Sequence, residues 1–111
     1  MKTTSRAYRD SLISLITNIE SREPKVLDRA ATLLAESVAK DRLIHVIGPG
    51  GHSNMAVEEV LWRAGGLAPV NAILDAGTNL IHGAKRSNLI ERTPGYAKGV
   101  LDAYGLQKGD V

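Results

Sequence analysis

Cysteine is missing from this sequence of 111 residues. Its absence excludes a disulfide framework, a thiolate metal site and a cysteine nucleophile, and it fits a reducing compartment. A large excess of charge of either sign is also missing. The net charge is +2, and the basic residues are scattered. Without a basic stripe interleaved with aromatics, nucleic-acid binding is not expected. No apolar run has the length of a signal-peptide core or a membrane span, so we expect a cytoplasmic protein with no membrane partner.

The length suits one small domain, and the apolar and charged fractions of 43% and 23% are ordinary for a globular protein. Two amphipathic helices are expected first. One covers residues 4–21 and has apolar residues at helical spacing; the other begins at Pro24, a residue favoured in the first helical turn, and ends near residue 39. Together they predict a helical hairpin over residues 1–41 whose apolar faces pack in a core or an interface.

Residues 42–66 read as a strand, a glycine loop and a helix. A strand covered on both faces is predicted over residues 43–47, where His45 is interpreted as a satisfied interior histidine rather than a ligand. The loop follows, and the helix begins at Ser53 and ends near residue 64, before a Gly-Gly stop. Free N–H groups and the positive end of the helix dipole meet at such a junction, which is typical of an anion site.

The loop sequence GPGGHS has Gly48, Gly50 and Gly51 but lacks the late glycine of the dinucleotide fingerprint and the Gly-Lys-Ser/Thr of a P-loop. Two interpretations therefore stay open. Ser53 either caps the helix in a plain tight turn or bonds a phosphate oxygen beside the free amides. A nucleotide-binding half-domain is a weaker alternative, which Asp75 after the second strand keeps alive.

The second strand is predicted over residues 69–74, which implies a right-handed parallel crossover from the first. Broken helical turns are expected over residues 76–93 and a helix over 95–104, after which Val111 has the place of a third strand's first residue. A sheet of two strands leaves an edge open. We therefore expect this chain to be half of a larger α/β unit, completed by a second polypeptide or by further sequence.

The helix after the loop carries two adjacent glutamates, Glu58 and Glu59. Successive helical side chains point about 100° apart, so at most one can face the loop. The pair is either a solvated charge pair or the source of a proton shuttle beside an anion. His52 and His82 are candidate acids, bases or donors to a sugar hydroxyl. Two histidines without a third ligand of suitable spacing do not predict zinc, and no metal or cofactor is expected.

The segment GPGGHSNMAVEEVLWRAGGLAPVNAIL, followed by IHGAKRSNLIERTPGYAKGVLDAYGLQKGDV, resembles the N-terminal half of a sugar isomerase (SIS) domain. It is most similar to the phosphosugar-isomerase-like branch and, through GGHS…EE, more distantly similar to the phosphoheptose isomerases. The resemblance covers nearly the whole chain. It implies a flavodoxin-like α/β fold, three layers around a parallel sheet of about five strands. Residues 1–111 would supply its two leading helices and a βαβα portion.

The resemblance also implies a phosphorylated sugar as ligand and an oligomer with sites at subunit interfaces. Ser53, with its loop neighbours from Gly48 to Asn54, would contact the substrate. Glu59, ahead of Glu58, would be the acid/base of an enediol step, and His82 would lie near a neighbouring subunit's site. The chain departs from the pattern in two ways. Its loop is one residue longer, and the Ser/Thr-rich loop with most of the phosphate contacts would follow Val111.

Two functions follow from this pattern. The first is a portion of an aldose–ketose isomerase that is active once a complementary chain or segment completes it. The second is a non-catalytic sugar-phosphate sensor or assembly subunit that regulates a partner chain. A glutamate and the phosphate loop facing one cavity would favour the enzyme, whereas a filled pocket would favour the binding module.

Overall fold

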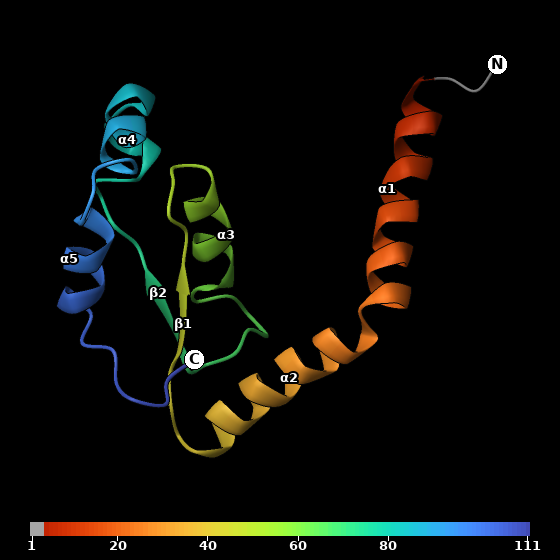
Figure 1. Cartoon of the computed structure of the whole chain (residues 1–111), viewed down its shortest axis with the longest axis horizontal. Coiled ribbons are helices and arrows are strands. Elements are labelled where there is room, and N and C mark those ends of the chain that lie inside the picture. The colour runs from red at the N-terminus through yellow and green to blue at the C-terminus, as the bar shows by residue number, and fades with distance from the viewer. Residues whose placement is uncertain (1–3) are drawn as a thin grey trace. The chain divides into compact units, whose positions relative to one another are not determined.

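A computed structural model describes residues 4–111 of the chain. Figure 1 labels the helices and strands in chain order. The chain divides into two compact units, Met1–Ala35 and Glu36–Val111, and each is described by itself.

The first unit holds helix α1 (Thr4–Arg22) and most of helix α2 (Pro24–Ala39), as predicted. Only Glu23 lies between the two helices. The Glu23 amide donates to the Ile19 carbonyl at 3.0 Å, and the Glu23 carbonyl accepts from the amides of Val26 and Leu27. A helical hairpin needs a connection of about two to five residues. The single residue Glu23 is shorter than such a connection, and Figure 1 shows the chain bending there. The hairpin over residues 1–41 stays a prediction.

Helix α1 buries none of its side chains within the described residues. Its large apolar residues are all exposed: Tyr8, Leu12, Ile13, Leu15, Ile16 and Ile19. A helix gains most of its stability from packing an apolar face. Within the described residues, this apolar face is left uncovered.

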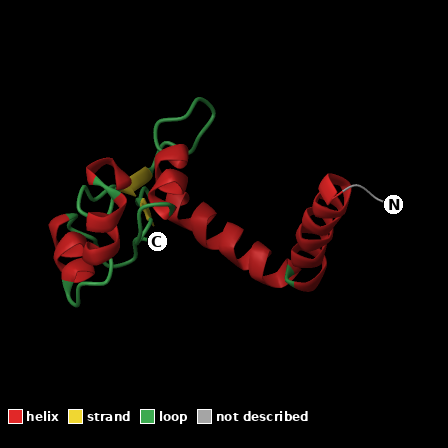
Figure 2. Ribbon diagram, turned by 90° about the horizontal axis from the view of Figure 1, so that it is seen from above, coloured by secondary structure: helices red, strands yellow, loops and turns green. Residues whose placement is uncertain are grey.

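The second unit is built on two parallel strands, β1 (Ile44–Ile47) and β2 (Val70–Ile73). The register pairs Ile44 with Val70 and Ile47 with Ile73. Figure 2 shows how short both strands are beside the helices. The apolar core consists of Ile44, Val57 and Ile73, of which Val57 comes from helix α3 (Ser53–Val60) between the strands. The parallel crossover is confirmed.

Helix α3 ends at Val60, four residues before the predicted end. Leu61 is extended with ψ of 132°, and Trp62 has φ of 55°, in the left-handed region. Trp62 is also 97% exposed. A side chain in solvent makes no packing contact that would hold another helical turn, so the chain leaves the helix here and turns toward β2.

Three short helices follow β2: the 3-10 turn η1 (Leu80–His82), α4 (Ala84–Ile90) and α5 (Tyr96–Ala103). They match the predicted broken turns and final helix. Figure 1 shows α3 on one side of the strands and α5 on the other. The end of α5 is fixed to the sheet because the Tyr104 hydroxyl donates to the Leu74 carbonyl at 3.1 Å.

Val111 pairs with β1 on the edge opposite β2. Its amide donates to the Leu43 carbonyl at 3.4 Å, and its carbonyl accepts from the His45 amide at 2.7 Å. Together these two bonds form a parallel bridge centred on Ile44. A third parallel strand that begins at Val111 would make these two bonds, and that strand stays a prediction. Among the described residues, no helix combines the length and the apolar character needed to span a membrane.

Candidate functional site

The glycine loop between β1 and α3 is tightly packed against the helix it precedes. A methyl group at Gly48 would lie 2.5 Å from the Ser53 carbonyl oxygen and 2.6 Å from the Asn54 nitrogen. Gly48 is therefore required sterically, since backbone occupies the space a side chain would need. The Asn54 amide donates to the Gly50 carbonyl at 3.1 Å, which joins the first turn of α3 to the loop.

The Ser53 hydroxyl closes this loop on itself. Its oxygen accepts from the Gly50 amide at 3.0 Å, and the hydroxyl donates to the Gly50 carbonyl at 2.9 Å. The cap position of α3 belongs to His52, whose side chain makes no capping bond. The interpretation of Ser53 as a helix cap is therefore wrong, because it is the first helical residue. Its contact with a phosphate stays a prediction.

Asn54 is only 1% exposed. Its side-chain amide donates to the Thr78 hydroxyl at 3.3 Å, and its Oδ1 atom has no partner within residues 4–111. Thr78 is linked in turn to α4, because the Ser87 hydroxyl donates to the Thr78 carbonyl at 2.6 Å. This buried chain of polar side chains holds α3, the loop after β2 and α4 together. Asn54 thus supports the site from inside the fold.

The structure places the two glutamates of α3 differently. Glu59 is 69% exposed and forms an ion pair at 3.0 Å with Arg63, which lies three residues beyond the end of α3. Glu58 accepts a hydrogen bond from the Asn79 side chain at 3.0 Å. Glu58 also lines a hollow over the end of β2 with Asp75 and Asn79. Both glutamates are exposed, and of the two Glu58 is the one that contacts the segment after β2.

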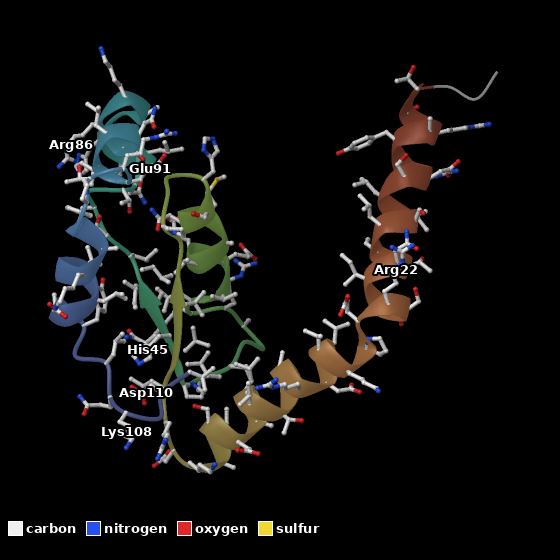
Figure 3. The ribbon with its side chains drawn as sticks, viewed as in Figure 1. Arg22, His45, Arg86, Glu91, Lys108 and Asp110 are labelled. Carbon is white, nitrogen blue, oxygen red and sulfur yellow. The ribbon has the colours of Figure 1, made fainter. Side chains whose placement is uncertain are left out.

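A third glutamate, Glu91, lies against the glycine loop. A methyl group at Gly50 would lie 2.5 Å from its Oε2 atom, and its side chain is 27% exposed. Figure 3 shows Glu91 where α4 approaches the loop. Sequence reasoning missed this residue. The available signal was topological, since the segment after β2 returns to the carboxyl edge of the sheet, but nothing in the sequence paired Glu91 with Gly50.

A cavity of about 130 Å³, here called the α5 cavity, lies between the glycine loop, the end of β2 and the start of α5. Its apolar lining comes from both strands and α5, with Ile47, Ile73 and Val100. Its polar lining residues are Asp75, Thr78, Glu91, Thr93 and Tyr96. Glu91 also lines a second hollow of about 280 Å³ against α4, here called the α4 hollow, whose other polar residues are His52, Ser87, Asn88 and Arg92.

Asp75 and Tyr96 form the polar wall of the α5 cavity. The Tyr96 hydroxyl donates to both carboxylate oxygens of Asp75, at 3.0 and 2.9 Å. This hydrogen bond, followed by burial, raises the pKa of Tyr96 above its usual value. A methyl at Gly77 would overlap the Tyr96 hydroxyl, so Gly77 makes the contact possible. Asp75 also accepts from the Thr78 amide at 2.8 Å, which joins its carboxylate to the loop after β2.

His52 is exposed and lines the α4 hollow together with Arg92. His82 lies at the exposed end of η1. The described residues contain no cluster of His, Asp and Glu side chains that could hold a metal ion.

At the opposite end of the strands, His45 joins two other polar side chains (Figure 3). Its Nε2 atom lies 2.9 Å from Asp110 Oδ2, and its Nδ1 atom lies 3.0 Å from the Asn71 amide nitrogen. The His45 hydrogen bond, with one from the Gln107 amide, lowers the pKa of Asp110. His45 is therefore a satisfied interior histidine, as predicted. It fixes the turn before Val111.

The comparisons agree with this architecture. Residues 7–111 match the SIS domain family, and the chain belongs to that family. A UPF0309 protein of Caldanaerobacter subterraneus is 41% identical over 104 residues, which are 93% of this chain and 42% of the relative. A UPF0309 protein of Listeria innocua is 39% identical, over 94% of this chain and 42% of the relative. A UPF0309 protein of Brucella ovis is 38% identical, over 97% and 44%.

The chain thus spans about two fifths of the length of the curated relatives it matches. Their names state no activity. Family membership confirms the predicted resemblance to the SIS domain and its mixed α/β class.

Proposed function

We propose that this chain supplies the glycine-loop half of a phosphosugar site and that the complete protein interconverts an aldose phosphate and a ketose phosphate. The observation that carries the proposal is the packing of Gly48 against the first turn of α3. This packing fixes the amino end of the helix at the carboxyl edge of the sheet. Ligands of open parallel sheets bind at that edge, and anions bind at helix N-termini. Membership of the SIS domain family supports the same conclusion.

The anionic end of the sugar is best accommodated in the α4 hollow. Gly51 and His52 bring the start of α3 to this hollow, and Arg92 adds a fixed positive charge. Arg92 is held by Asn88, whose side-chain oxygen accepts from Arg92 Nε at 2.5 Å. A guanidinium and a helix N-terminus both favour a doubly charged phosphate. Gly50, Ser53 and the rest of the loop would shape this end of the site.

Glu58 is the better placed of the two α3 glutamates to act as acid/base. Its carboxylate lies over the end of β2 and shares a hollow with Asp75, whereas Glu59 is turned to solvent. In the proposed step, the carboxylate removes the proton from C2 of the open-chain aldose, forming a cis-enediolate with its negative charge on the C1 oxygen. The same group returns that proton to C1 while the hydroxyl proton at C2 moves to the C1 oxygen, which gives the ketose. General acid/base catalysis of this kind contributes about 10²–10⁴ in rate.

The remaining predictions concern the complete protein. We propose a flavodoxin-like, three-layer domain in which the segment after Val111 continues the third strand beside β1. A complementary segment or chain would add the main phosphate loop. The exposed apolar residues of α1 would be covered in an oligomer, and His82 would then lie near a neighbouring site. We place this assembly in the cytoplasm, which the lack of cysteine fits.

The test compares the two glutamates in the complete protein. Glu58→Gln should lower sugar-phosphate isomerisation by at least about 10² while leaving sugar-phosphate binding nearly intact. Glu59→Gln should turn over normally because its carboxylate bonds Arg63 in solvent. Isomerisation is measured through the exchange of the C2 proton with deuterated water. If Glu59→Gln alone loses activity, the roles are reversed, and if both variants react normally, the isomerase proposal fails.

A second function, a non-catalytic sugar-phosphate sensor, is favoured by one observation. The Glu58 carboxylate is already bonded to Asn79, which in turn accepts from the Ile81 amide at 2.9 Å. This arrangement would suit a fixed structural carboxylate. Tight binding of a sugar phosphate without any exchange of its C2 proton would establish the sensor.

A further inference from the structure

We propose that Asn79 is the positioning residue of the Glu58 acid/base: its side-chain amide holds one carboxylate oxygen of Glu58 and leaves the other free for the C2 proton. This inference rests on the proposed function and names the residue that orients its carboxylate. The contact is direct, because the Asn79 side-chain nitrogen donates to Glu58 Oε1 at 3.0 Å. Both residues line the hollow of about 220 Å³ over the end of β2.

Glu58 needs a partner to keep one orientation. Its side chain is exposed on α3, and a glutamate in solvent is free to change between several rotamers. A misplacement of about 1 Å between reacting groups can cost about 10²-fold in rate. A hydrogen bond to an ionised acceptor is stronger than one between neutral groups, so the amide of Asn79 can select one rotamer of the carboxylate.

Asn79 is itself fixed by the loop after β2. Its backbone amide donates to the Asp75 carbonyl at 3.2 Å, and its side-chain oxygen accepts from the Ile81 amide at 2.9 Å, which makes Asn79 the cap of η1. The Ile81 amide can only donate, so the oxygen of the Asn79 side chain must face it. The NH₂ group is therefore directed at Glu58, and a rigid loop sets the position of the carboxylate.

The second oxygen of Glu58 stays available. Within residues 4–111, Glu58 Oε2 accepts no hydrogen bond and forms no ion pair. None of the residues that line the hollow is a lysine, arginine or histidine. A nearby cation would stabilise a carboxylate in its charged form and weaken it as a base. The neutral amide of Asn79 orients the carboxylate without adding such a charge, which suits a group that has to take up a proton.

Asn79→Asp is the decisive variant in the complete protein. The new carboxylate can still accept from the Ile81 amide, but it has no hydrogen to donate to Glu58. The variant should lower kcat about tenfold or more, the size of a lost hydrogen bond to a charged group, and leave KM nearly unchanged. The acidic limb of the kcat–pH profile should also move to higher pH by about one unit, because a second carboxylate opposes the ionisation of Glu58.

The assay follows exchange of the C2 proton with deuterated water, and aldopentose and aldohexose phosphates are the probes. Asn79→Ala, which loses both side-chain bonds, should show the same loss of kcat with a smaller shift of the pH profile. Asn18→Asp is the matched control, because it makes the same chemical change at an exposed position of α1 and should react as wild type. In the Glu58→Gln background, Asn79→Asp should cause no further loss, since two residues that act through one group are not additive.

The outcomes separate this inference from the proposed function. If wild type exchanges the C2 proton and Asn79→Asp keeps the wild-type kcat and pH profile, the inference is wrong while the proposed function stands. Loss of activity in Asn79→Ala but not in Asn79→Asp would assign the effect to the cap of η1 and would also overturn the inference. A further loss in the Glu58→Gln background, or a change confined to KM, would mean that Asn79 contacts the substrate instead. If wild type exchanges the C2 proton of neither class of probe, both proposals are wrong.

Discussion

Replacing Gly48 by alanine is the sharpest test of the glycine loop. The added methyl group would lie 2.5 Å from the Ser53 oxygen and 2.6 Å from the Asn54 nitrogen. Carbon atoms in contact are normally about 3.5–4.0 Å apart. The atoms in the way are backbone, so no side chain can rotate to relieve the overlap. The first turn of α3 must therefore move away from the end of β1 by about 1 Å.

Two costs follow from that movement. Overpacking of a filled site typically costs about 1–3 kcal/mol, and rigid backbone neighbours favour the upper end of that range. The bond from the Asn54 amide to the Gly50 carbonyl, at 3.1 Å, would also be strained or lost. A net hydrogen bond is worth about 0.5–1.5 kcal/mol. We therefore expect Gly48→Ala to lower the free energy of unfolding by about 2–4 kcal/mol.

Urea unfolding followed by far-ultraviolet circular dichroism measures this loss. Trp62 fluorescence would be a poor probe because the indole is already 97% exposed in the folded protein. The matched control is Gly99→Ala within α5, where a methyl group meets no atom within 4 Å. That substitution should stabilise the protein by roughly 0.5–1 kcal/mol, since glycine is disfavoured inside helices.

The opposite signs of the two Gly→Ala changes separate steric overlap from a general effect of removing glycine. A Gly48→Ala protein that unfolds at the wild-type urea concentration with an unchanged slope would refute the packing of α3 on the loop. Phosphate affinity gives a second measure. It should fall in Gly48→Ala, because the amides of the first turn are displaced, and stay constant in Gly99→Ala.

Three further predictions concern other parts of the fold. Tyr96→Phe should lower the free energy of unfolding by about 1.5–3 kcal/mol, because it removes the hydrogen bond to Asp75. The pKa of Tyr96 is raised in the folded protein. Wild-type stability should therefore fall as the pH rises above about 10 through that raised pKa, and the variant should lack this loss. The pKa of Asp110 is lowered mainly by His45, so its contribution to stability is present above about pH 4 and is lost as pH falls further. Acid titration of Asp110→Asn, followed by circular dichroism, should lack that part of the loss. Ile16→Lys, on the exposed face of α1, should reduce the mass of any oligomer seen by size-exclusion chromatography with light scattering, and an unchanged mass would show that α1 is not in the interface.

Much of the chain's local structure could be predicted from short-range sequence signals. Pro24 marked the start of α2, and the β-branched run before Gly48 marked β1. Val111 was expected to begin a third strand, and its two hydrogen bonds to β1 are those of a parallel bridge. The predictions of α2 and β1 held because hydrophobic period, proline and glycine act through the geometry of a few neighbouring residues.

The errors arose where local signals were incomplete. The end of α3 was placed at the Gly-Gly pair, but Trp62 already adopts a positive φ before it. The hairpin over residues 1–41 was predicted from two apolar helices, and the single residue between them is shorter than the roughly two to five residues of a helical hairpin loop. A cap was one of the two interpretations of Ser53, because serine favours that position, whereas its hydroxyl bonds Gly50 in the loop.

The sequence by itself determined the order of the elements, the need for glycine after β1 and the adjacency of two glutamates on one helix. Only the tertiary structure decided which carboxylates face the carboxyl edge of the sheet. Glu58 and Glu59 differ by a rotation of about 100° about the helix axis, and with Val57 packed into the core both are exposed but only Glu58 reaches Asn79 after β2. Glu91 reaches Gly50 because the segment after β2 returns over the sheet, and a contact between residues so far apart in the chain leaves no local pattern in the sequence.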